Sequence, residues 1–305
     1  MSEFSLVTAE NSFLIEPDEL SIPRPGLWPS EASVEYELDG RTCTEGKCMR
    51  EAWFRNMGFS KDKHTDPGMA IKWDMGKSAE VFSVERWKRM GIYKANSVKF
   101  FDRALSVSGE LDCVIKNPET CGLVGVEAKS FYGHYASQEI CGSKRPPIPG
   151  RPKEENFLQA AIYAAKYREK LEQFRLYYIE RGDGHRVEFE VGVEGDEENL
   201  RPFHRQIDGP YWNTFREERV VRKYTMNDIY ARYNKLRKYL IDRETPPREF
   251  VEVWDQEKAD WLYANGKTSK SKYDKFIKSK DEGDWQCAYC SFPQTCRNAD
   301  RPLER

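Results

Sequence analysis

The sequence of 305 residues lacks the features of a membrane protein or an exported protein. No apolar run approaches the ~20 residues that span a bilayer, and the N-terminus has neither a basic segment nor a long apolar one. We therefore expect a cytoplasmic protein. Because disulfides are rare in that compartment, we expect the 8 cysteines to have another use.

The sequence also has little excess of charge and few histidines. Its net charge is −2, which excludes a globally basic protein, so a nucleic-acid partner would have to meet a local basic surface. The 4 histidines form no recognisable metal-binding motif. Aromatic residues are abundant, with 8 Trp, 16 Tyr and 16 Phe, and this predicts a sizeable core and excludes wholesale disorder.

The order of predicted elements indicates an α/β fold with a central mixed sheet flanked by helices. Hydrophobic periodicity predicts helices at 48–58, 68–90 and 154–171, and strands within 92–130, 174–180 and 186–193. We expect the large apolar side chains of the first two helices to anchor the core: Trp53, Trp73, Phe82 and Trp87.

Four segments are predicted to lie outside this core. Residues 1–35 carry four prolines and read as an extended lead-in, and residues 143–153 read as a basic, proline-rich loop without regular structure. Residues 195–242 are charged and predicted to be mostly helical, as an elaboration of a single domain over residues 36–305. Residues 266–284 are rich in Lys, Ser, Gly and Asp and are predicted to be a mobile linker.

Two strand-like segments joined by a turn carry the residues with the clearest chemistry. Residues 109–115 and 125–130 alternate with a period of two, and Asn-Pro and Gly mark the turn between them. Asp112 and Glu127 are equidistant from the midpoint of that turn, so antiparallel pairing places their carboxylates opposite each other. Lys129 lies two residues after Glu127 and shares its face.

Two opposed carboxylates repel each other, and a hard cation such as Mg²⁺ relieves that repulsion. The cation can polarise a phosphoryl oxygen and lower the pKa of bound water. Lys129 is placed to orient that water or to stabilise developing charge. The alternative interpretation is a surface hairpin with a Glu–Lys pair, which needs no cation.

The C-terminal segment 285–297 carries three cysteines with the spacing C-x2-C-x5-C. Cys287, Cys290 and Cys296 need a fourth partner to complete a metal site, and Cys48 is the best candidate, with Cys43 second. Four thiolates suit a structural zinc ion and an iron–sulfur cluster equally. The alternative is three buried thiols in a loop.

Together these motifs resemble the PD-(D/E)XK nucleases of the RecB type, in particular their iron–sulfur branch. That branch includes the cluster-bearing nuclease of CRISPR adaptation, the AddB nuclease domain and phage relatives, and the resemblance covers about residues 45–297. The matching segments are Cys48–Trp53 for the first cluster cysteine, Gly76–Glu80, Gly109–Asp112 and Glu127–Lys129 for the three acidic motifs, and Gln159–Tyr163 for the Gln-x3-Tyr helix. Many relatives have His at the position of Glu80. A Glu is still a ligand for a hard cation, but the expected metal preference changes.

The resemblance implies a restriction-endonuclease-like core and a metal-dependent deoxyribonuclease, an exonuclease acting on DNA ends or single strands, in a prokaryotic cell or a phage-infected host. It implies that Glu80, Asp112 and Glu127, with the Ala128 carbonyl, hold Mg²⁺ or Mn²⁺. Lys129 would then position the attacking water, and Gln159 and Tyr163, which share a helix face, would align the phosphate. The rival hypothesis is a non-catalytic DNA-binding or complex-assembly subunit with the same fold.

The resemblance also assigns the cysteines. Cys48, Cys287, Cys290 and Cys296 would hold a [4Fe–4S] cluster that joins an N-terminal helix to the C-terminal tail, with zinc as the alternative.

Candidate contacts to DNA lie outside these motifs. Lys144, Arg145, Arg151 and Lys153 are candidates for phosphate contacts. Exposed aromatic residues can stack on the bases of a single strand, and the candidates are Tyr132, Tyr135, Tyr211 and Trp212. For both sets the alternative is an ordinary solvated surface.

Overall fold

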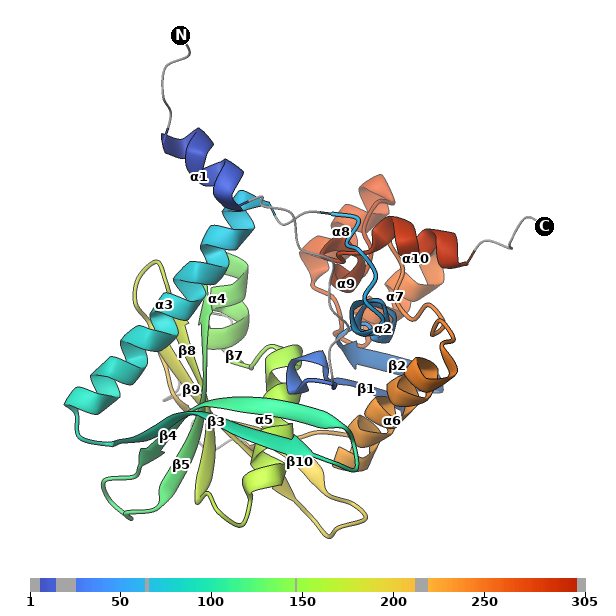
Figure 1. Ribbon diagram of the computed structural model, residues 1–305. Helices are drawn as coiled ribbons and strands as arrows, with labels where there is room; N and C mark the ends of the chain where they lie inside the picture. The colour runs from blue at the N-terminus through green and yellow to red at the C-terminus, as the bar shows by residue number, and fades with distance from the viewer. Residues whose placement is uncertain (1–5, 15–25, 64–65, 146, 212–218, 301–305) are drawn as a thin grey trace. The chain divides into compact units, whose positions relative to one another are not determined.

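The computed structural model describes residues 6–14, 26–63, 66–145, 147–211 and 219–300, and the chain divides into two compact units (Figure 1). Unit 1 comprises residues 1–16, 25–46 and 65–237, and unit 2 comprises residues 17–24, 47–64 and 238–305. None of the helices in the described part of the chain has the length and hydropathy needed to cross a bilayer.

Unit 1 is built around a mixed sheet of seven strands in the order β11-β10-β9-β8-β5-β4-β3. β5 pairs with β8 in parallel, and the other neighbours pair antiparallel. The predicted α/β fold with a mixed sheet is therefore confirmed. The strands are β3 (Tyr93–Asp102), β4 (Val107–Lys116), β5 (Leu123–Phe131), β8 (Gln173–Glu180), β9 (Arg186–Glu194), β10 (Arg201–Asp208) and β11 (Arg219–Val221).

Two helices, α3 (Pro67–Arg89) and α5 (Glu154–Tyr167), cover the sheet on opposite faces. Trp87 of α3 packs in a buried cluster with Val126 of β5, whereas α5 contacts the neighbouring Glu127 through Gln159. Because successive side chains of a strand point to opposite faces, the two helices lie on different sides of β5. The active-site candidates of β5 therefore face α5.

The start of α3 is fixed by its sequence. Asp66 caps the helix by accepting a hydrogen bond from the Met69 N–H at 3.1 Å, and Pro67 occupies the first turn, where its missing N–H leaves no bond unmade. At Gly76 the helix passes close to β5, and a Cβ there would make an ordinary contact with Ser130 Oγ at 3.5 Å. Only the C-terminal half of α3 buries side chains.

Shorter elements complete unit 1. β1 (Ser33–Leu38) and β2 (Arg41–Gly46) form a hairpin, and its turn residues Asp39 and Gly40 both have positive φ, as a tight two-residue turn requires. The remaining elements are α1 (Leu6–Leu14), the 3-10 helix η1 (Pro29–Glu31), α4 (His134–Cys141), β6 (Gly142–Lys144), β7 (Pro147–Pro149) and most of α6 (Met226–Asp242).

Unit 2 is helical and brings together segments that are far apart in the sequence. The rings of Trp53, Phe54 and Phe59 pack on one another, and Phe292 packs on Phe54. A second cluster contains Trp254, Ala259 and Phe276. The helices are α2 (Met49–Asn56), α7 (Gln256–Ala264), α8 (Lys270–Ser279), α9 (Trp285–Ala288) and α10 (Pro293–Ala299).

Several predictions about elements outside the core were wrong. Residues 6–14 form a helix where an extended lead-in was predicted, and residues 15–25 lie outside the described part. Residues 143–153 include the short hairpin of β6 and β7. Residues 195–242 contain strands β10 and β11 before α6 begins, and the predicted linker 266–284 contains α8.

Two of the four predicted core anchors were also wrong. Trp53 and Trp87 are buried, but Trp73 and Phe82 are more than half exposed.

His204 is a buried polar residue of the sheet that makes stability depend on pH. It lies between the rings of Phe157 and Phe189, its Nδ1 has no hydrogen-bond partner, and burial lowers its pKa to about 3, with Arg222 and Arg151 acting in the same direction. The unfolded chain binds this proton near pH 6.5 and the folded chain does not. The free energy of unfolding should therefore fall by about 1.4 kcal/mol per pH unit as the pH drops below 6.5.

His204→Phe should remove that slope, measured by urea denaturation at a series of pH values from 7 to 5. The matched control is His185→Gln, because His185 is half-exposed beside Asp183. Parallel slopes in the wild type and His204→Phe would contradict the assignment.

Candidate active site

The hairpin of β4 and β5 positions the two central carboxylates. The last pair of its register is Cys113 with Val126, and Asp112 and Glu127 follow as the next positions along the two strands. Asp112 Oδ2 accepts a hydrogen bond from the Ala128 N–H at 2.8 Å. The carboxylate therefore takes a backbone donor of the facing strand and fixes Asp112 against β5.

Glu127 is the most buried acid of the site, with 1 % of its surface exposed. Its Oε1 accepts hydrogen bonds from Lys129 Nζ at 2.6 Å and from Gln159 Nε2 at 2.6 Å. Its Oε2 is buried and has no hydrogen-bond partner. A buried carboxylate oxygen without a partner carries a desolvation penalty, so this atom is a vacant acceptor.

Burial dominates the electrostatics of the three acids. It raises the pKa of Glu127 against the opposing charge of Lys129, and Asp112 and Glu80 raise that pKa further. Burial likewise raises the pKa of Asp112, and burial followed by the charge of Asp112 raises that of Glu80. For Lys129, burial lowers the pKa, but the carboxylates outweigh it and the pKa is raised. The four groups thus lie within electrostatic reach of one another.

The helix α5 contributes Gln159 and Tyr163 in different ways. Gln159 contacts the Glu127 carboxylate directly. The Tyr163 hydroxyl donates to the Glu110 carbonyl at 2.9 Å, and its ring stacks on Phe174 with the centroids 6.0 Å apart. Tyr163 therefore ties α5 to β4, two residues before Asp112.

Glu110 belongs to this site and was not singled out from the sequence. Its carbonyl anchors Tyr163, and its charge helps to raise the pKa values of Asp112 and Glu80. The signal was available, because residues i and i+2 of a strand share a face and Glu110 precedes Asp112 by two.

The structure brings the predicted acidic residues together without forming a ready-made metal site. As the side chains lie, no three His, Cys, Asp or Glu residues in the described ranges are arranged to hold a metal ion. At Glu127 the Lys129 ammonium occupies one carboxylate oxygen. The Ala128 N–H is already engaged by Asp112, and its side chain is buried on the α3 face.

The four predicted cluster cysteines all belong to unit 2. Burial raises the pKa of Cys48 and Cys290 to about 12 and that of Cys287 to about 11. The charge of Glu51, followed by those of Cys296 and Cys287, further raises the pKa of Cys290. In the described part of the chain these thiols do not form a group of three arranged to hold a metal ion. Acids, Glu249 and Glu51, are the charged groups that most raise the pKa of Cys48.

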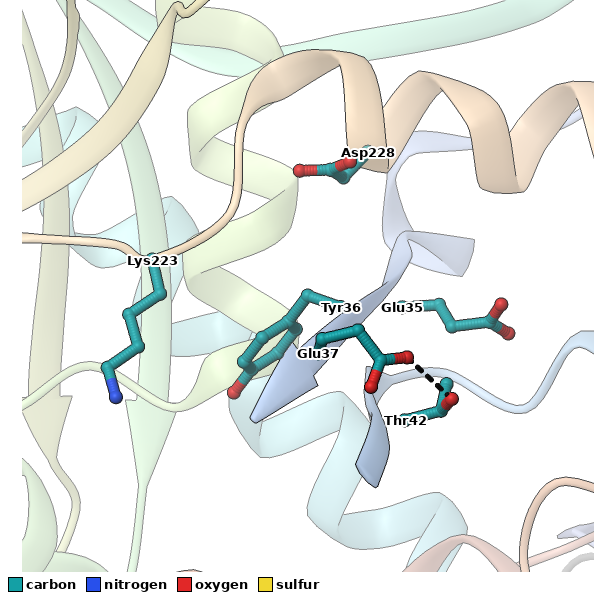
Figure 2. A pocket seen from close by; sticks show the side chains of 6 residues that line it. All are labelled: Glu35, Tyr36, Glu37, Thr42, Lys223 and Asp228. Atoms are coloured by element: carbon teal, nitrogen blue, oxygen red, sulfur yellow. Dashed lines mark hydrogen bonds between the residues drawn. The ribbon is translucent and has the colours of Figure 1, made fainter. Parts of the chain in front are cut away.

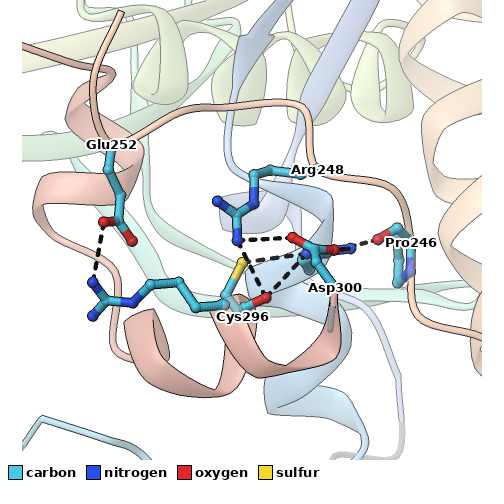
Figure 3. A network of polar contacts seen from close by, with 7 residues as sticks. Pro246, Arg248, Glu252, Cys296 and Asp300 are labelled. Carbon is cyan, nitrogen blue, oxygen red and sulfur yellow. Dashed lines mark hydrogen bonds and ion pairs between the residues drawn. The ribbon is translucent and has the colours of Figure 1, made fainter. Parts of the chain in front are cut away.

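Arg50 connects the helix after Cys48 to the C-terminal tail, and Figure 3 labels its partners Pro246, Cys296 and Asp300. Its Nε donates to the Pro246 carbonyl at 2.7 Å, and its Nη2 pairs with Asp300 at 2.7 Å. Its Nη1 donates to the Cys296 carbonyl at 3.3 Å and lies 3.5 Å from Cys296 Sγ. Arg50 thus joins α2 to the cysteine-bearing tail.

The predicted DNA contacts lie around β6, β7 and the start of α5. Lys144, Arg145 and Arg151 are exposed, and Arg151 is 3.6 Å from Glu139. Lys153 immediately precedes α5, and its backbone N–H donates to the Tyr178 hydroxyl. Tyr132 and Tyr135 are exposed, whereas Trp212 lies outside the described residues.

An open pocket of about 380 Å³ lies elsewhere in unit 1, lined by residues of β1, β2 and α6 (Figure 2). Its carboxylates already have partners: Glu35 pairs with Arg232 at 3.0 Å, and Glu37 accepts from Thr42 Oγ1 at 2.8 Å. Asp228 accepts from the Thr225 N–H at 2.7 Å at the start of α6. We therefore place the candidate site at Asp112 and Glu127 and not in this pocket.

No family model and no curated protein gives a significant match to this sequence, so the case for its function depends on the residues of this site.

Proposed function

We propose that the protein is a metal-dependent deoxyribonuclease of the PD-(D/E)XK type, acting as an exonuclease on DNA ends or single strands. The observation that carries this proposal is the buried carboxylate of Glu127, which faces Asp112 and has one oxygen without a partner. Burying a carboxylate oxygen without a hydrogen-bond partner is costly, and such buried polar groups gather at functional sites.

The donor set fits a hard divalent cation. Asp112, Glu127 and Glu80 supply carboxylate oxygens, the ligands that Mg²⁺ and Mn²⁺ prefer, and a bound cation would supply Lewis-acid activation of the phosphodiester and of water. Cation binding at Glu127 competes with the Lys129 ammonium, 2.6 Å away. A Lys129 released from that pair is free to orient water or to neutralise charge on the phosphate, while Gln159 holds the orientation of Glu127.

The direct test is an assay of the purified full-length chain on end-labelled linear and circular single-stranded DNA. With Mn²⁺ we expect the linear strand to be degraded and the circle to persist, and chelator should stop the reaction. Cutting of both substrates would support an endonuclease. Absence of cutting with Mn²⁺ or Mg²⁺, in protein shown to be folded, would defeat the proposal.

The rival function is a non-catalytic DNA-binding or assembly subunit, and one observation favours it. In the described residues the Glu127 carboxylate is tied to Lys129 and Gln159, and no three-ligand group is preformed. The rival predicts DNA binding without cutting. Calorimetric titration with Mn²⁺ separates the nuclease from the binding subunit. Only the nuclease needs to bind a cation, and Asp112→Asn would weaken that binding.

We further propose that Cys48, Cys287, Cys290 and Cys296 hold a [4Fe–4S] cluster in unit 2, with zinc as the alternative. The support is that all four thiols belong to one compact unit. Four thiolates are the normal ligands of both groups. Arg50 already holds the Cys296 backbone against the unit that carries Cys48.

Protein purified without oxygen should be brown and contain about four irons per chain, by absorption and metal analysis. Cys290→Ser should lose the colour and most of the iron, because a cluster needs each thiolate. The matched control is Cys121→Ser, since Cys121 is an exposed cysteine of unit 1. Colourless protein that contains zinc would show that zinc, and not a cluster, occupies the site. Equal iron content in Cys290→Ser and Cys121→Ser would contradict a metal site at these four cysteines.

A further inference from the structure

Three large aromatic side chains of unit 1 are exposed on α3 and on the segment that follows β5. Trp73 of α3 is 56 % exposed, Tyr132 after β5 is 67 % exposed, and Tyr135 in the first turn of α4 is 77 % exposed. Leaving such side chains in water forgoes favourable burial, and exposed apolar groups that gather in one place mark binding surfaces. We refer to these three residues as the aromatic shelf.

Arg181 links the backbone segments that carry Trp73 and Tyr132. Its Nη1 donates to the carbonyl of Lys72, the residue before Trp73, at 3.0 Å. Its backbone N–H donates to the carbonyl of Phe131, the residue before Tyr132, at 3.0 Å. One arginine therefore connects the backbone beside Trp73 to the backbone beside Tyr132.

Trp73 lies on α3, the helix that carries Glu80, whereas Tyr132 and Tyr135 lie on the segment that follows β5, the strand that carries Glu127 and Lys129. Trp73 precedes Glu80 by seven residues, or two helical turns, so the two share a face of α3 and are ~10 Å apart along its axis. Tyr132 follows Lys129 by three residues, which is ~10 Å along an extended chain. At ~3.4 Å per stacked nucleotide this spacing corresponds to roughly three nucleotides.

We infer that Trp73, Tyr132 and Tyr135 form a base-stacking subsite, which holds unpaired bases roughly three nucleotides from the bond to be cut. The inference rests on the proposed function for the choice of nucleic acid as the occupant. Aromatic faces bind every base without reading sequence, and a nearby arginine adds attraction to the phosphates. Bases inside a duplex are already stacked and offer no face to the shelf, so the subsite selects single strands.

The test measures binding of fluorescent twelve-nucleotide oligothymidine to the full chain by anisotropy, with chelator present so that nothing is cut. The wild type should bind this strand about 5- to 150-fold more tightly than a fully abasic strand of equal length. Trp73→Ala and Tyr132→Ala should each weaken binding of oligothymidine by about tenfold and leave binding of the abasic strand unchanged. Trp73→Phe should retain most of the affinity.

The matched control is Phe101→Ala, because Phe101 is about as exposed as Trp73 but lies at the far end of β3, in the edge strand. It should bind both strands like the wild type. Equal binding of oligothymidine by the wild type and the double variant Trp73→Ala, Tyr132→Ala would overturn the subsite. So would an equal loss on the abasic strand, a wild-type preference for duplex, or no binding at all.

The outcome for the subsite can be told apart from the outcome for the nuclease. If the chain cuts DNA with Mn²⁺ and the shelf variants bind normally, the subsite fails and the proposed function stands. If the shelf variants lose affinity and no DNA is cut, the base-stacking subsite is confirmed and the protein is a non-catalytic DNA-binding protein.

Discussion

Asp112→Asn should lower the rate of Mn²⁺-dependent DNA cutting by about 100- to 1,000-fold and leave the fold intact. The Asn side chain has the same shape, and its carbonyl oxygen can still accept the hydrogen bond that Asp112 receives from the Ala128 N–H. The variant therefore removes a negative charge and little else. Calorimetry should show much weaker Mn²⁺ binding, because the charge that opposes Glu127 is gone.

Asp102→Asn is the matched control for this substitution. Asp102 also combines a backbone hydrogen bond, from Leu105, with a lysine, Lys166, but it lies at the end of β3 and is partly exposed. Its replacement should change cutting less than twofold, since a surface ion pair contributes at most about 1 kcal/mol to stability. Wild-type cutting by Asp112→Asn in folded protein would remove this residue from the mechanism.

Arg50→Met should destabilise unit 2 by about 2–4 kcal/mol. The Arg50 side chain is 6 % exposed and donates to two backbone carbonyls and to Asp300, and Met fills a similar volume without a donor. The buried Pro246 carbonyl would lose its partner, which carries a larger penalty than the loss of a solvated bond. Hydrogen exchange of amides in residues 47–63 and 285–300 should speed up accordingly, while β4 and β5 in unit 1 stay protected.

Arg248→Met tests whether burial is the cause. Arg248 contacts the same two partners, the Cys296 carbonyl at 3.3 Å and Asp300 at 2.8 Å, but its side chain is 31 % exposed. Water can replace its bonds, so the loss should stay below about 1 kcal/mol. Equal destabilisation by both substitutions would show that the shared Asp300 contact, and not the buried carbonyl, is decisive.

The sequence predicts the hairpin of the candidate site because the information there is local. The distance of Asp112 and Glu127 from one turn determines their pairing, and the period of two places Lys129 on the face of Glu127. Gln159 was assigned through the resemblance, and helical spacing adds that it shares a face with Tyr163. The orientation of Glu127 toward Lys129 depends on burial by α5, which no local pattern contains.

The errors elsewhere have physical causes. Strand β10 was predicted to be helical because its buried positions include His204 and Gln206, so polarity hides the alternation that marks a strand. Trp73 was assigned to the core because α3 reads as one amphipathic helix, yet the sheet covers only its C-terminal half. Helix α8 is lysine-rich and buries only Phe276, which packs against Trp254. This contact joins two segments that are separate in the sequence, so no local pattern predicts it.

The contact of Arg50 with Cys296 has a consequence for how the chain reaches its final form. The two residues are 246 positions apart, and a ribosome adds about 5–20 residues each second. Helix α2 is therefore synthesised about 12–50 s before the Cys296 carbonyl that Arg50 contacts. During that time Trp53 and Phe54 remain exposed to solvent. Chaperone binding to nascent chains should therefore concentrate on residues 47–63 and end only after residue 296 has left the ribosome.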